Sequence, residues 1–306
     1  MHNIFQKTIA KELKFEGIGL HTGETARIKI CPANTDQGII FLRTDLNSNN
    51  KIVANFKNVS NAKLCTTLSN EFGVTVSTVE HLMAAFYILG IDNAVVEINK
   101  SEVPIMDGSS KDFIDLLNSV GLKHQSKKRK IIKITNKFEF EYNGKTISIE
   151  PNDEGLEVDF KLNYKNKLIG NQSNRIKFYK DELEKIYSSR TFCLFEDIEK
   201  IKKNGLAKGG SLNNAIVVKD DKILNDGGLR NNKEFVNHKI LDCIGDLYTS
   251  GYRIIGNVEC SQGGHYLTNQ LLRKVFLNKE NFSILEIKEK NLPHTLINRN
   301  LLKSIA

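Results

Sequence analysis

The chain has 306 residues, more than the roughly 100 to 200 typical of one domain, and this length predicts two compact domains. Apolar residues make up 40% and charged residues 26% of the chain, which excludes a disordered or membrane-spanning composition. The formal net charge of +8 suits an anionic partner, but the basic residues are spread along the chain. We therefore expect solvated basic faces and no nucleic-acid partner.

Targeting signals and disulfides are not indicated. The longest apolar stretch, residues 82–91, is about half the roughly 20 residues that a spanning helix needs, and residues 1–17 contain no signal-peptide apolar region. The five cysteines are an odd number and include no C-x-x-C pair. We expect a cytoplasmic protein whose thiols are reduced and mostly buried.

In chain order, the first expected elements are strands over residues 8–15 and 25–31. They flank a glycine-spaced loop, GIGLHTG, at residues 17–23. Its glycines follow the pattern G-x-G-x-x-x-G, one residue longer than the dinucleotide fingerprint, and no helix pattern follows to bind a pyrophosphate. The loop therefore does not predict a dinucleotide-binding fold.

The first expected helix begins at Ser77, because Ser77 and Glu80 have the spacing of a capping box, and it ends at Gly90. A strand over residues 93–98 and a helix over residues 110–120 follow. Residues 123–130 are polar and basic, which is typical of a boundary between domains. We place the two domains at residues 1–126 and 127–306.

The second half opens with strand-like alternation over residues 131–140 and 146–150. In each half, a helix that carries a histidine ends at a glycine and leads into a strand, which suggests two related α+β halves. Chance explains this weak repeat equally well, so duplication stays open. Three helical patterns and a last strand follow, at residues 181–187, 195–204, 233–250 and 253–259.

The candidate metal ligands lie on the two histidine-bearing helices. His238 and Asp242 are four residues apart, so they share one face of a helix, and imidazole and carboxylate both bind zinc. At this spacing a surface hydrogen-bonded pair is more common than a metal site. His81 is the best candidate for a third ligand, although alone it is an ordinary half-buried histidine. Three protein ligands with one open position are typical of a catalytic zinc.

Glu80 has two interpretations that cannot both fully hold. As the third position of a capping box it would bond back to the Ser77 amide, and local sequence favours this role. As a base it would take a proton from water at the metal, as zinc hydrolases require. Other metal-hydrolase patterns are missing, because the chain has no H-E-x-x-H, H-x-x-E-H or P-C-x-x-C.

Six short motifs occur in one order along nearly the whole chain. They are GIGLHTG at residues 17–23, STVEHL at 77–82, PIMDGS at 104–109, SRTF at 189–192, HKILDCIGD at 238–246 and GGH at 263–265. Together they resemble the bacterial UDP-3-O-acyl-N-acetylglucosamine deacetylases. Several separated motifs in order are far more specific than any one of them.

The resemblance implies a zinc enzyme of lipid A biosynthesis. Such an enzyme hydrolyses the N-acetyl group of UDP-3-O-(3-hydroxyacyl)-N-acetylglucosamine, releasing acetate and the free amine. The resemblance makes His81, His238 and Asp242 the Zn²⁺ ligands and favours Glu80 as the base. It also implies an α+β fold with two similar domains, each a β-sheet packed on two helices, whose helices face each other with the active site between the domains.

Four further residues receive roles from the resemblance. Thr191 would hydrogen-bond the oxyanion that forms when water attacks the acetyl carbonyl. His265, protonated, would steady the developing charge or donate a proton to the leaving amine. Asp246 would hold that histidine and raise its pKa, and Lys239 would lie near the substrate carbonyl and phosphates. Without the resemblance, these are an ordinary threonine, a loop histidine, a solvated carboxylate and an exposed lysine.

An inserted segment around residues 192–212 would form a passage for the acyl chain, lined by Phe192, Phe195, Ile198 and Gly210. Core packing of a short helix explains the same residues. A substrate of this kind sits in the inner membrane, so the basic surface would favour peripheral contact with anionic lipid. We expect a monomer.

Two alternative functions stay open. A zinc deacetylase of another amidated sugar or peptide would share the metal site but would not depend on the acyl chain. An inactive relative would bind the nucleotide-lipid as a sensor or scaffold, and its binding would survive loss of Glu80. The sequence fixes neither the preferred acyl-chain length nor the role of the tail after residue 278.

Overall fold

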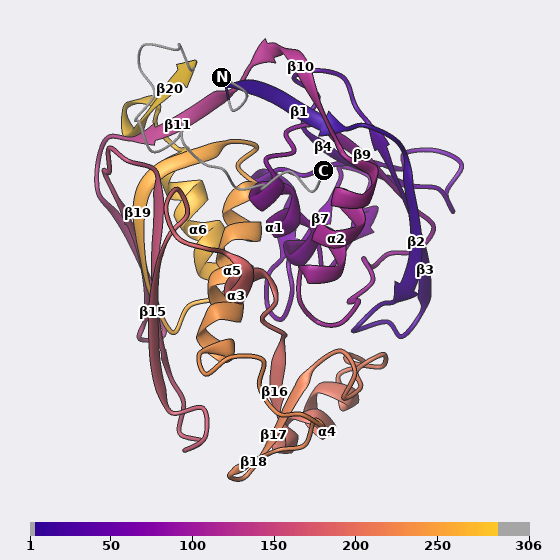
Figure 1. Ribbon diagram of the computed structural model, residues 1–306, viewed down its shortest axis with the longest axis vertical. Coiled ribbons are helices and arrows are strands. Elements are labelled where there is room, and N and C mark those ends of the chain that lie inside the picture. The colour runs from indigo at the N-terminus through magenta and orange to yellow at the C-terminus, as the bar shows by residue number, and fades with distance from the viewer. Residues whose placement is uncertain (1–3, 287–306) are drawn as a thin grey trace.

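The computed structural model describes residues 4–286 and has an α+β fold, with several β-sheets and six α-helices in that part of the chain (Figure 1). Apart from α4, Phe195–Lys203, the helices lie in the middle of the molecule. A five-stranded sheet from the first half of the chain flanks them on one side, and a seven-stranded sheet from the second half flanks them on the other. The mixture of helices and largely antiparallel sheets confirms the α+β part of the expected fold.

The five-stranded sheet has the order β2-β3-β9-β4-β5. Only β4 and β9 pair in parallel. Alternate residues of β3, Ala26, Ile28 and Ile30, are buried, whereas their neighbours reach solvent, as a half-buried strand requires. The strands are β2 Leu13–Ile18, β3 Thr25–Pro32, β4 Ile39–Arg43, β5 Lys51–Val53 and β9 Ala94–Ile98, and helix α2 is Lys111–Val120.

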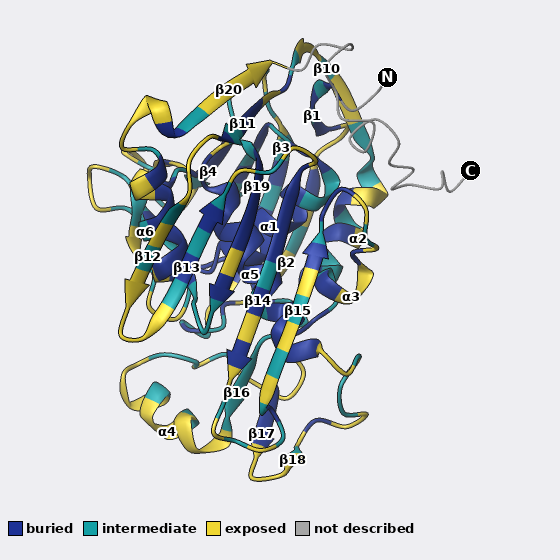
Figure 2. Ribbon diagram, turned by 90° about the vertical axis from the view of Figure 1, so that its left-hand side faces the viewer, coloured by how far each residue is buried: buried dark blue, intermediate teal, exposed yellow. Residues whose placement is uncertain are grey.

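The seven-stranded sheet is built around β19, Arg253–Ser261, which pairs antiparallel with β13 and parallel with both β11 and β14. Figure 2 shows buried and exposed residues alternating along its strands. Helix α6, His265–Val275, packs on its β12 and β13 side. The other strands are β11 Lys130–Ile134, β12 Phe138–Tyr142, β13 Lys145–Glu150, β14 Leu156–Asn163, β15 Asn171–Lys177 and β20 Phe282–Glu286.

Smaller elements complete the described chain. A two-stranded sheet joins β1 to β10, and two three-stranded sheets stand apart from the large ones. One of these, with helix α4, forms the projecting end of the molecule in Figure 1. The remaining elements are β1 Phe5–Ile9, η1 Phe56–Asn58, β6 Val59–Asn61, β7 Thr67–Ser69, β8 Thr75–Val76, β10 Leu122–Lys128, α3 Glu184–Tyr187, β16 Phe192–Leu194, α4 Phe195–Lys203, β17 Ile216–Lys219, β18 Lys222–Ile223 and η2 Lys279–Asn281.

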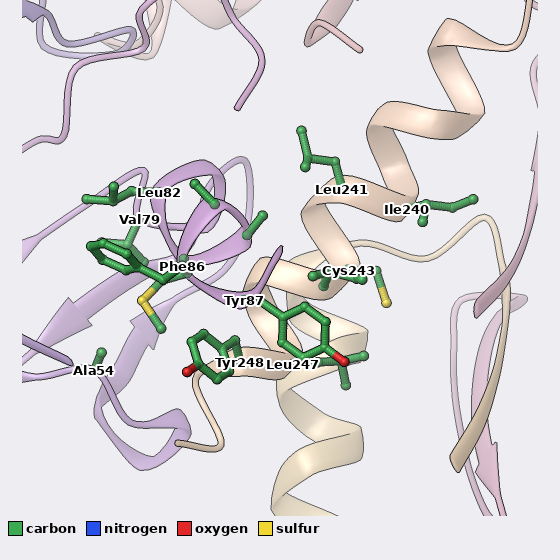
Figure 3. Close-up of a cluster of buried hydrophobic side chains, with 14 of the residues drawn as sticks. Ala54, Val79, Leu82, Phe86, Tyr87, Ile240, Leu241, Cys243, Leu247 and Tyr248 are labelled. Carbon is green, nitrogen blue, oxygen red and sulfur yellow. The ribbon is translucent and has the colours of Figure 1, made fainter. Parts of the chain in front are cut away.

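Helices α1, Glu80–Leu89, and α5, Glu234–Tyr248, pack against each other in the centre of the protein (Figure 3). Every residue of α5 except Lys239 is buried, so this helix is enclosed on all sides. Apolar side chains of both helices fill the contact, with Leu82 and Phe86 from α1 and Leu241 from α5 fully buried. The polar residues on these helices are therefore held inside the protein.

Gly245 lets the two helices approach each other closely. A Cβ atom at this position would lie 1.9 Å from the carbonyl oxygen of Glu80. In an ordinary helix, Gly→Ala would stabilise the protein by about 1 kcal/mol. Here we expect Gly245→Ala to lower the free energy of unfolding by about 1 to 3 kcal/mol, because the helices must move apart. Urea denaturation measures this change, and a more stable Gly245→Ala variant would contradict the packing described.

Two of the expected strands are interrupted. Residues 8–15 form β1 and β2, separated by a bend, because β1 pairs with β10 and β2 pairs with β3 in a different sheet. Residues 131–140 likewise divide between β11 and β12. In the break between these strands, the Thr135 hydroxyl donates a hydrogen bond to the Glu280 carbonyl. Residues 123–130, placed at the domain boundary, form β10 and the start of β11 rather than irregular chain. Helix α3 is shorter than predicted.

The five cysteines are all free, as expected, but only Cys243 and Cys260 are buried, and the other three are half-buried. Within residues 4–286, no helix is both long enough and apolar enough to cross a membrane. The tail after residue 286 lies outside the described residues.

Candidate active site

The three predicted metal ligands lie together at the contact between α1 and α5. His81 is on the first turn of α1, whereas His238 and Asp242 are one turn apart on α5. One ligand atom from each residue lies within 4.8 Å of the others. Asp242 Oδ1 is 3.4 Å from His81 Nε2 and 3.3 Å from His238 Nε2, and all three side chains are buried. The three residues are therefore arranged to share one cation.

The hydrogen bonds of these residues fit a metal ion. His238 Nδ1 is 3.0 Å from the Ser189 carbonyl oxygen, which can only accept, so Nδ1 carries the proton and the Nε2 lone pair is free for a ligand bond. Burial lowers the pKa of His238 to about 3, which keeps its ring neutral. Asp242 Oδ1 is buried without a hydrogen-bond partner in the described chain. A cation between the two imidazoles would satisfy this oxygen.

Asp242 is ionised. Burial alone would raise its pKa, but His238 and the neighbouring Lys239 ammonium outweigh burial and hold the pKa well below its ordinary value. Lys239 Nζ donates to Asp242 Oδ2 at 2.6 Å. Lys239 is therefore half-buried beside the carboxylate of Asp242. Without the motif resemblance, the sequence suggests an exposed lysine at this position.

Glu80 does not cap a helix, so the predicted capping box is wrong. Ser77 pairs with Glu102 in extended conformation and its hydroxyl donates to the Ser101 carbonyl, so α1 begins only at Glu80. The Glu80 carboxylate instead accepts a hydrogen bond of 2.9 Å from the Thr66 amide. Burial raises its pKa, which makes it a better proton acceptor than an exposed glutamate.

His265 is the first residue of α6 rather than part of a loop. Its Nδ1 lies 2.8 Å from Asp246 Oδ2, and its Nε2 lies 4.0 Å from Asp242 Oδ2, so the ring connects the two aspartates. Burial lowers the pKa of His265, but the charges of Asp246 and Glu80 outweigh burial and raise it to about 9. The ring is therefore protonated at neutral pH, as expected of an acid beside Asp246.

No sequence pattern singled out Thr66, which lies in this site. It lies directly before β7. Its backbone amide donates a hydrogen bond to the Glu80 carboxylate, and its hydroxyl donates one to Asp246 Oδ1. One threonine thus holds the two carboxylates that face His265. Its neighbours Cys65 and Thr67 line a cavity of about 470 Å³ that also reaches the inserted segment at Leu206. The lining of this cavity includes neither the three candidate metal ligands nor Glu80 and His265.

Two backbone hydrogen bonds hold Thr191 in place. Its amide donates to the Gly108 carbonyl, and its carbonyl accepts from the Ile216 amide. The preceding residue, Arg190, pairs with the fully buried Glu234 at the start of α5, with 2.8 Å between Nε and Oε1. The segment that carries Thr191 is therefore fixed to the helix that carries His238 and Asp242.

The predicted passage residues have different surroundings. Phe192 contacts the metal-site region, with its ring centre 6.4 Å from that of His238, and Gly210 faces Leu20 of the glycine-spaced loop. Phe195 begins α4 and is 44% exposed, while Ile198 is half-buried. No residue of α4 is buried, so core packing of this helix does not explain its apolar side chains.

Substituting Asp246→Asn would keep the shape of this side chain but remove the charge that holds His265. We expect kcat to fall by about 10- to 100-fold, as is typical when the partner that orients a site histidine is lost. The KM and the bound metal should change little, because Asp246 contacts neither ligand nitrogen. Steady-state kinetics with metal analysis measure the effect, and an unchanged kcat would show that the pair is not needed.

Comparison with known proteins identifies the family. The model of the LpxC family, described as UDP-3-O-acyl N-acetylglycosamine deacetylase, matches residues 6–277. A UDP-3-O-acyl-N-acetylglucosamine deacetylase of Pasteurella multocida (strain Pm70) is 42% identical over 295 residues, covering 95% of this chain and 96% of the relative. One from Histophilus somni (strain 129Pt) is 41% identical over 290 residues, covering 94% and 95%, and one from Pseudoalteromonas translucida (strain TAC 125) is 43% identical over 275 residues, covering 89% and 90%. The chain belongs to the LpxC family.

Proposed function

We propose that this protein hydrolyses the N-acetyl group of UDP-3-O-(3-hydroxyacyl)-N-acetylglucosamine, a step of lipid A biosynthesis, and releases acetate and the free amine. The observation that carries the proposal is the convergence of His81, His238 and Asp242 with Glu80 and His265 in one buried site. The names of the family and of its relatives supply the substrate.

His81, His238 and Asp242 would hold the metal, and their imidazole and carboxylate donors fit Zn²⁺. When bound there, zinc supplies a Lewis acid that polarises the amide carbonyl and makes water a stronger nucleophile at neutral pH. The ionised Asp242 provides the negative charge that such an ion requires, and the Ser189 carbonyl orients His238 toward it.

The remaining residues would move protons and stabilise charge. Glu80 accepts a proton as the water oxygen bonds to the acetyl carbon. Thr191 and Lys239 stabilise the oxyanion that develops on the carbonyl oxygen. The protonated His265 then donates a proton to the nitrogen as the carbon–nitrogen bond breaks, which yields the amine and acetate. Glu80 and His265 have pKa values shifted in the directions that these roles need.

The acyl chain would occupy the inserted segment around residues 192–212. Phe192 lies beside the site, Gly210 leaves room next to the glycine-spaced loop, and Phe195 and Ile198 present apolar surface on α4. Substrate truncation tests this assignment. We expect acetate release from the acylated nucleotide to exceed release from UDP-N-acetylglucosamine by at least about 100-fold in kcat/KM, because remote binding energy is used in the transition state. Equal rates would favour a deacetylase of another amidated sugar.

We further propose the domain division at residues 1–126 and 127–306, with the active site between the two layered halves. The position of α1 and α5 between the two large sheets supports it. We also propose a cytoplasmic monomer that contacts the inner membrane peripherally. The exposed Phe195 and Leu212 of the inserted segment, together with the net charge of +8, support this contact.

A further inference from the structure

The chain enters α1 through a backbone conformation that its sequence does not favour. Thr78, two residues before Glu80, has a φ of 56°, in the left-handed region. A β-branched residue rarely adopts this conformation, because its Cβ substituents crowd the backbone. Such a residue keeps a left-handed backbone only when its surroundings impose it. Thr78 is buried, so these surroundings are parts of the protein itself.

Glu102 supplies the contact that holds Thr78. The Thr78 hydroxyl donates to Glu102 Oε1 at 2.8 Å. Glu102 is 1% exposed, and its carboxylate accepts three more hydrogen bonds, from the His21 amide and from the amide and hydroxyl of Thr22. All four donors are uncharged. Because one buried carboxylate accepts all four hydrogen bonds, it holds the Thr78 hydroxyl and the residues 21–22 in fixed relative positions.

The neighbouring backbone is shaped around this carboxylate. A Cβ atom on Gly19 would lie 2.5 Å from Glu102 Oε2, so the second glycine of the GIGLHTG loop makes room for it. The Ser77 amide donates to the Ser101 carbonyl and the Val103 amide donates to the Ser77 carbonyl. These two bonds hold the residues on either side of Glu102 against the residue that precedes Thr78.

Two other hydrogen bonds that involve side chains hold the first turn of α1, from the Ser110 hydroxyl to the His81 carbonyl and from the Thr66 amide to the Glu80 carboxylate, but no side chain caps its N-terminus. The cap residue is Val79, which makes no side-chain hydrogen bond to the helix. Glu80 and His81 follow directly, so the direction in which the helix begins sets the positions of both side chains. On the opposite side, the Glu80 carbonyl rests against Gly245 of α5. A change at Thr78 would therefore shift Glu80 and His81 relative to α5.

We propose that Thr78 and Glu102 are positioning residues: their hydrogen bond imposes the left-handed turn that starts α1 and so places Glu80 and His81 against His238, Asp242 and His265. The proposal rests on the proposed function only in its prediction for kcat. Its prediction for metal affinity is independent of the reaction.

The test compares Thr78→Gly with Thr78→Ser in the full-length, zinc-loaded protein. Glycine adopts the left-handed backbone without strain but lacks the hydroxyl, whereas serine keeps the hydroxyl. We expect Thr78→Ser to retain kcat within about threefold and Thr78→Gly to lose about 10- to 100-fold, because a displacement near 1 Å can cost this much. The KM should stay within about threefold in both variants, because Thr78 does not line the cavity beside the site.

Zinc affinity, measured by competition with a chromophoric chelator, is the second readout. We expect it to weaken by about 10-fold in Thr78→Gly and to be unchanged in Thr78→Ser, because His81 moves with the helix start. Glu102→Gln should behave like Thr78→Gly. Glu97→Gln is the matched control, because Glu97 is half-buried on the neighbouring strand β9 and pairs with Lys29. It should match the parent.

The outcomes separate the two proposals. A parent that releases no acetate would end the proposed function, while the ratio of zinc affinities between Thr78→Gly and Thr78→Ser would still decide the positioning role. Parent-like kcat and zinc affinity in Thr78→Gly would overturn the positioning role. Equal losses in Thr78→Ser and Thr78→Gly would also overturn it, as would a Thr78→Gly protein that fails to fold while Glu102→Gln behaves like the parent.

Discussion

The Glu80→Gln variant should lose about 10²- to 10⁴-fold in kcat, the range that a general base contributes. Glutamine has nearly the same shape, and its carbonyl oxygen can keep the hydrogen bond from the Thr66 amide, but it cannot accept a proton from water. The variant should therefore stay folded and keep its metal. Single-turnover acetate release together with metal analysis measures both properties.

Glu97→Gln is a matched control here too, because it removes a carboxylate on β9 that pairs with Lys29. A Glu80→Gln kcat within about tenfold of the parent would fall outside the range for a base and would return Glu80 to a structural role. Substrate binding should be nearly unchanged in Glu80→Gln. A parent that binds the nucleotide-lipid but releases no acetate would instead be the inactive binder.

The Asp242→Asn variant should lose both metal and activity. Asparagine is neutral, so the half-buried Lys239 ammonium loses its anionic partner and the metal loses its only charged ligand. A metal ion that polarises a carbonyl supplies several kcal/mol, so we expect a loss of about 10³-fold or more in kcat/KM. Breaking a buried ion pair should also lower the free energy of unfolding by about 3 to 5 kcal/mol. Metal analysis and urea denaturation measure these losses.

Asp115→Asn provides the comparison, because Asp115 is exposed on α2 and pairs with Lys111 along the helix. It should keep the metal, the activity and the unfolding free energy of the parent within about 0.5 kcal/mol. An Asp242→Asn protein that binds one zinc ion as tightly as the parent would show that the metal lies elsewhere.

The sequence was sufficient to single out His81, His238 and Asp242, whose ligand atoms lie within 4.8 Å of one another in the structure. His238 and Asp242 are four residues apart and therefore share one face of their helix. The predicted ends of this helix lie within about two residues of the observed ends, and errors of this size do not change which residues share a face. His81 was harder, because it was chosen as the third candidate only from its place near the start of the other histidine-bearing helix, and the motif resemblance then supported that choice. The order of helices and strands around these residues also followed from periodicity and glycine positions.

The errors arise where tertiary contacts override local signals. Ser77 and Glu80 have capping-box spacing, but pairing of Ser77 with Glu102, 25 residues further along the chain, delays the start of α1. Long strand patterns were divided because their two parts pair with different strands, in different sheets for β1 and β2 and within one sheet for β11 and β12. Thr66 was missed because its role depends on contacts with Glu80 and Asp246, which lie 14 and 180 residues away. No local pattern encodes such contacts.

The central claim is that a metal held by His81, His238 and Asp242 is needed to remove the acetyl group from an acylated UDP-glucosamine. The most direct measurement follows acetate release from that substrate by the purified protein before chelation, after chelation, and after Zn²⁺ is returned. We expect chelation to abolish release and one equivalent of zinc to restore it. Undiminished release from the metal-free, folded protein would contradict the claim.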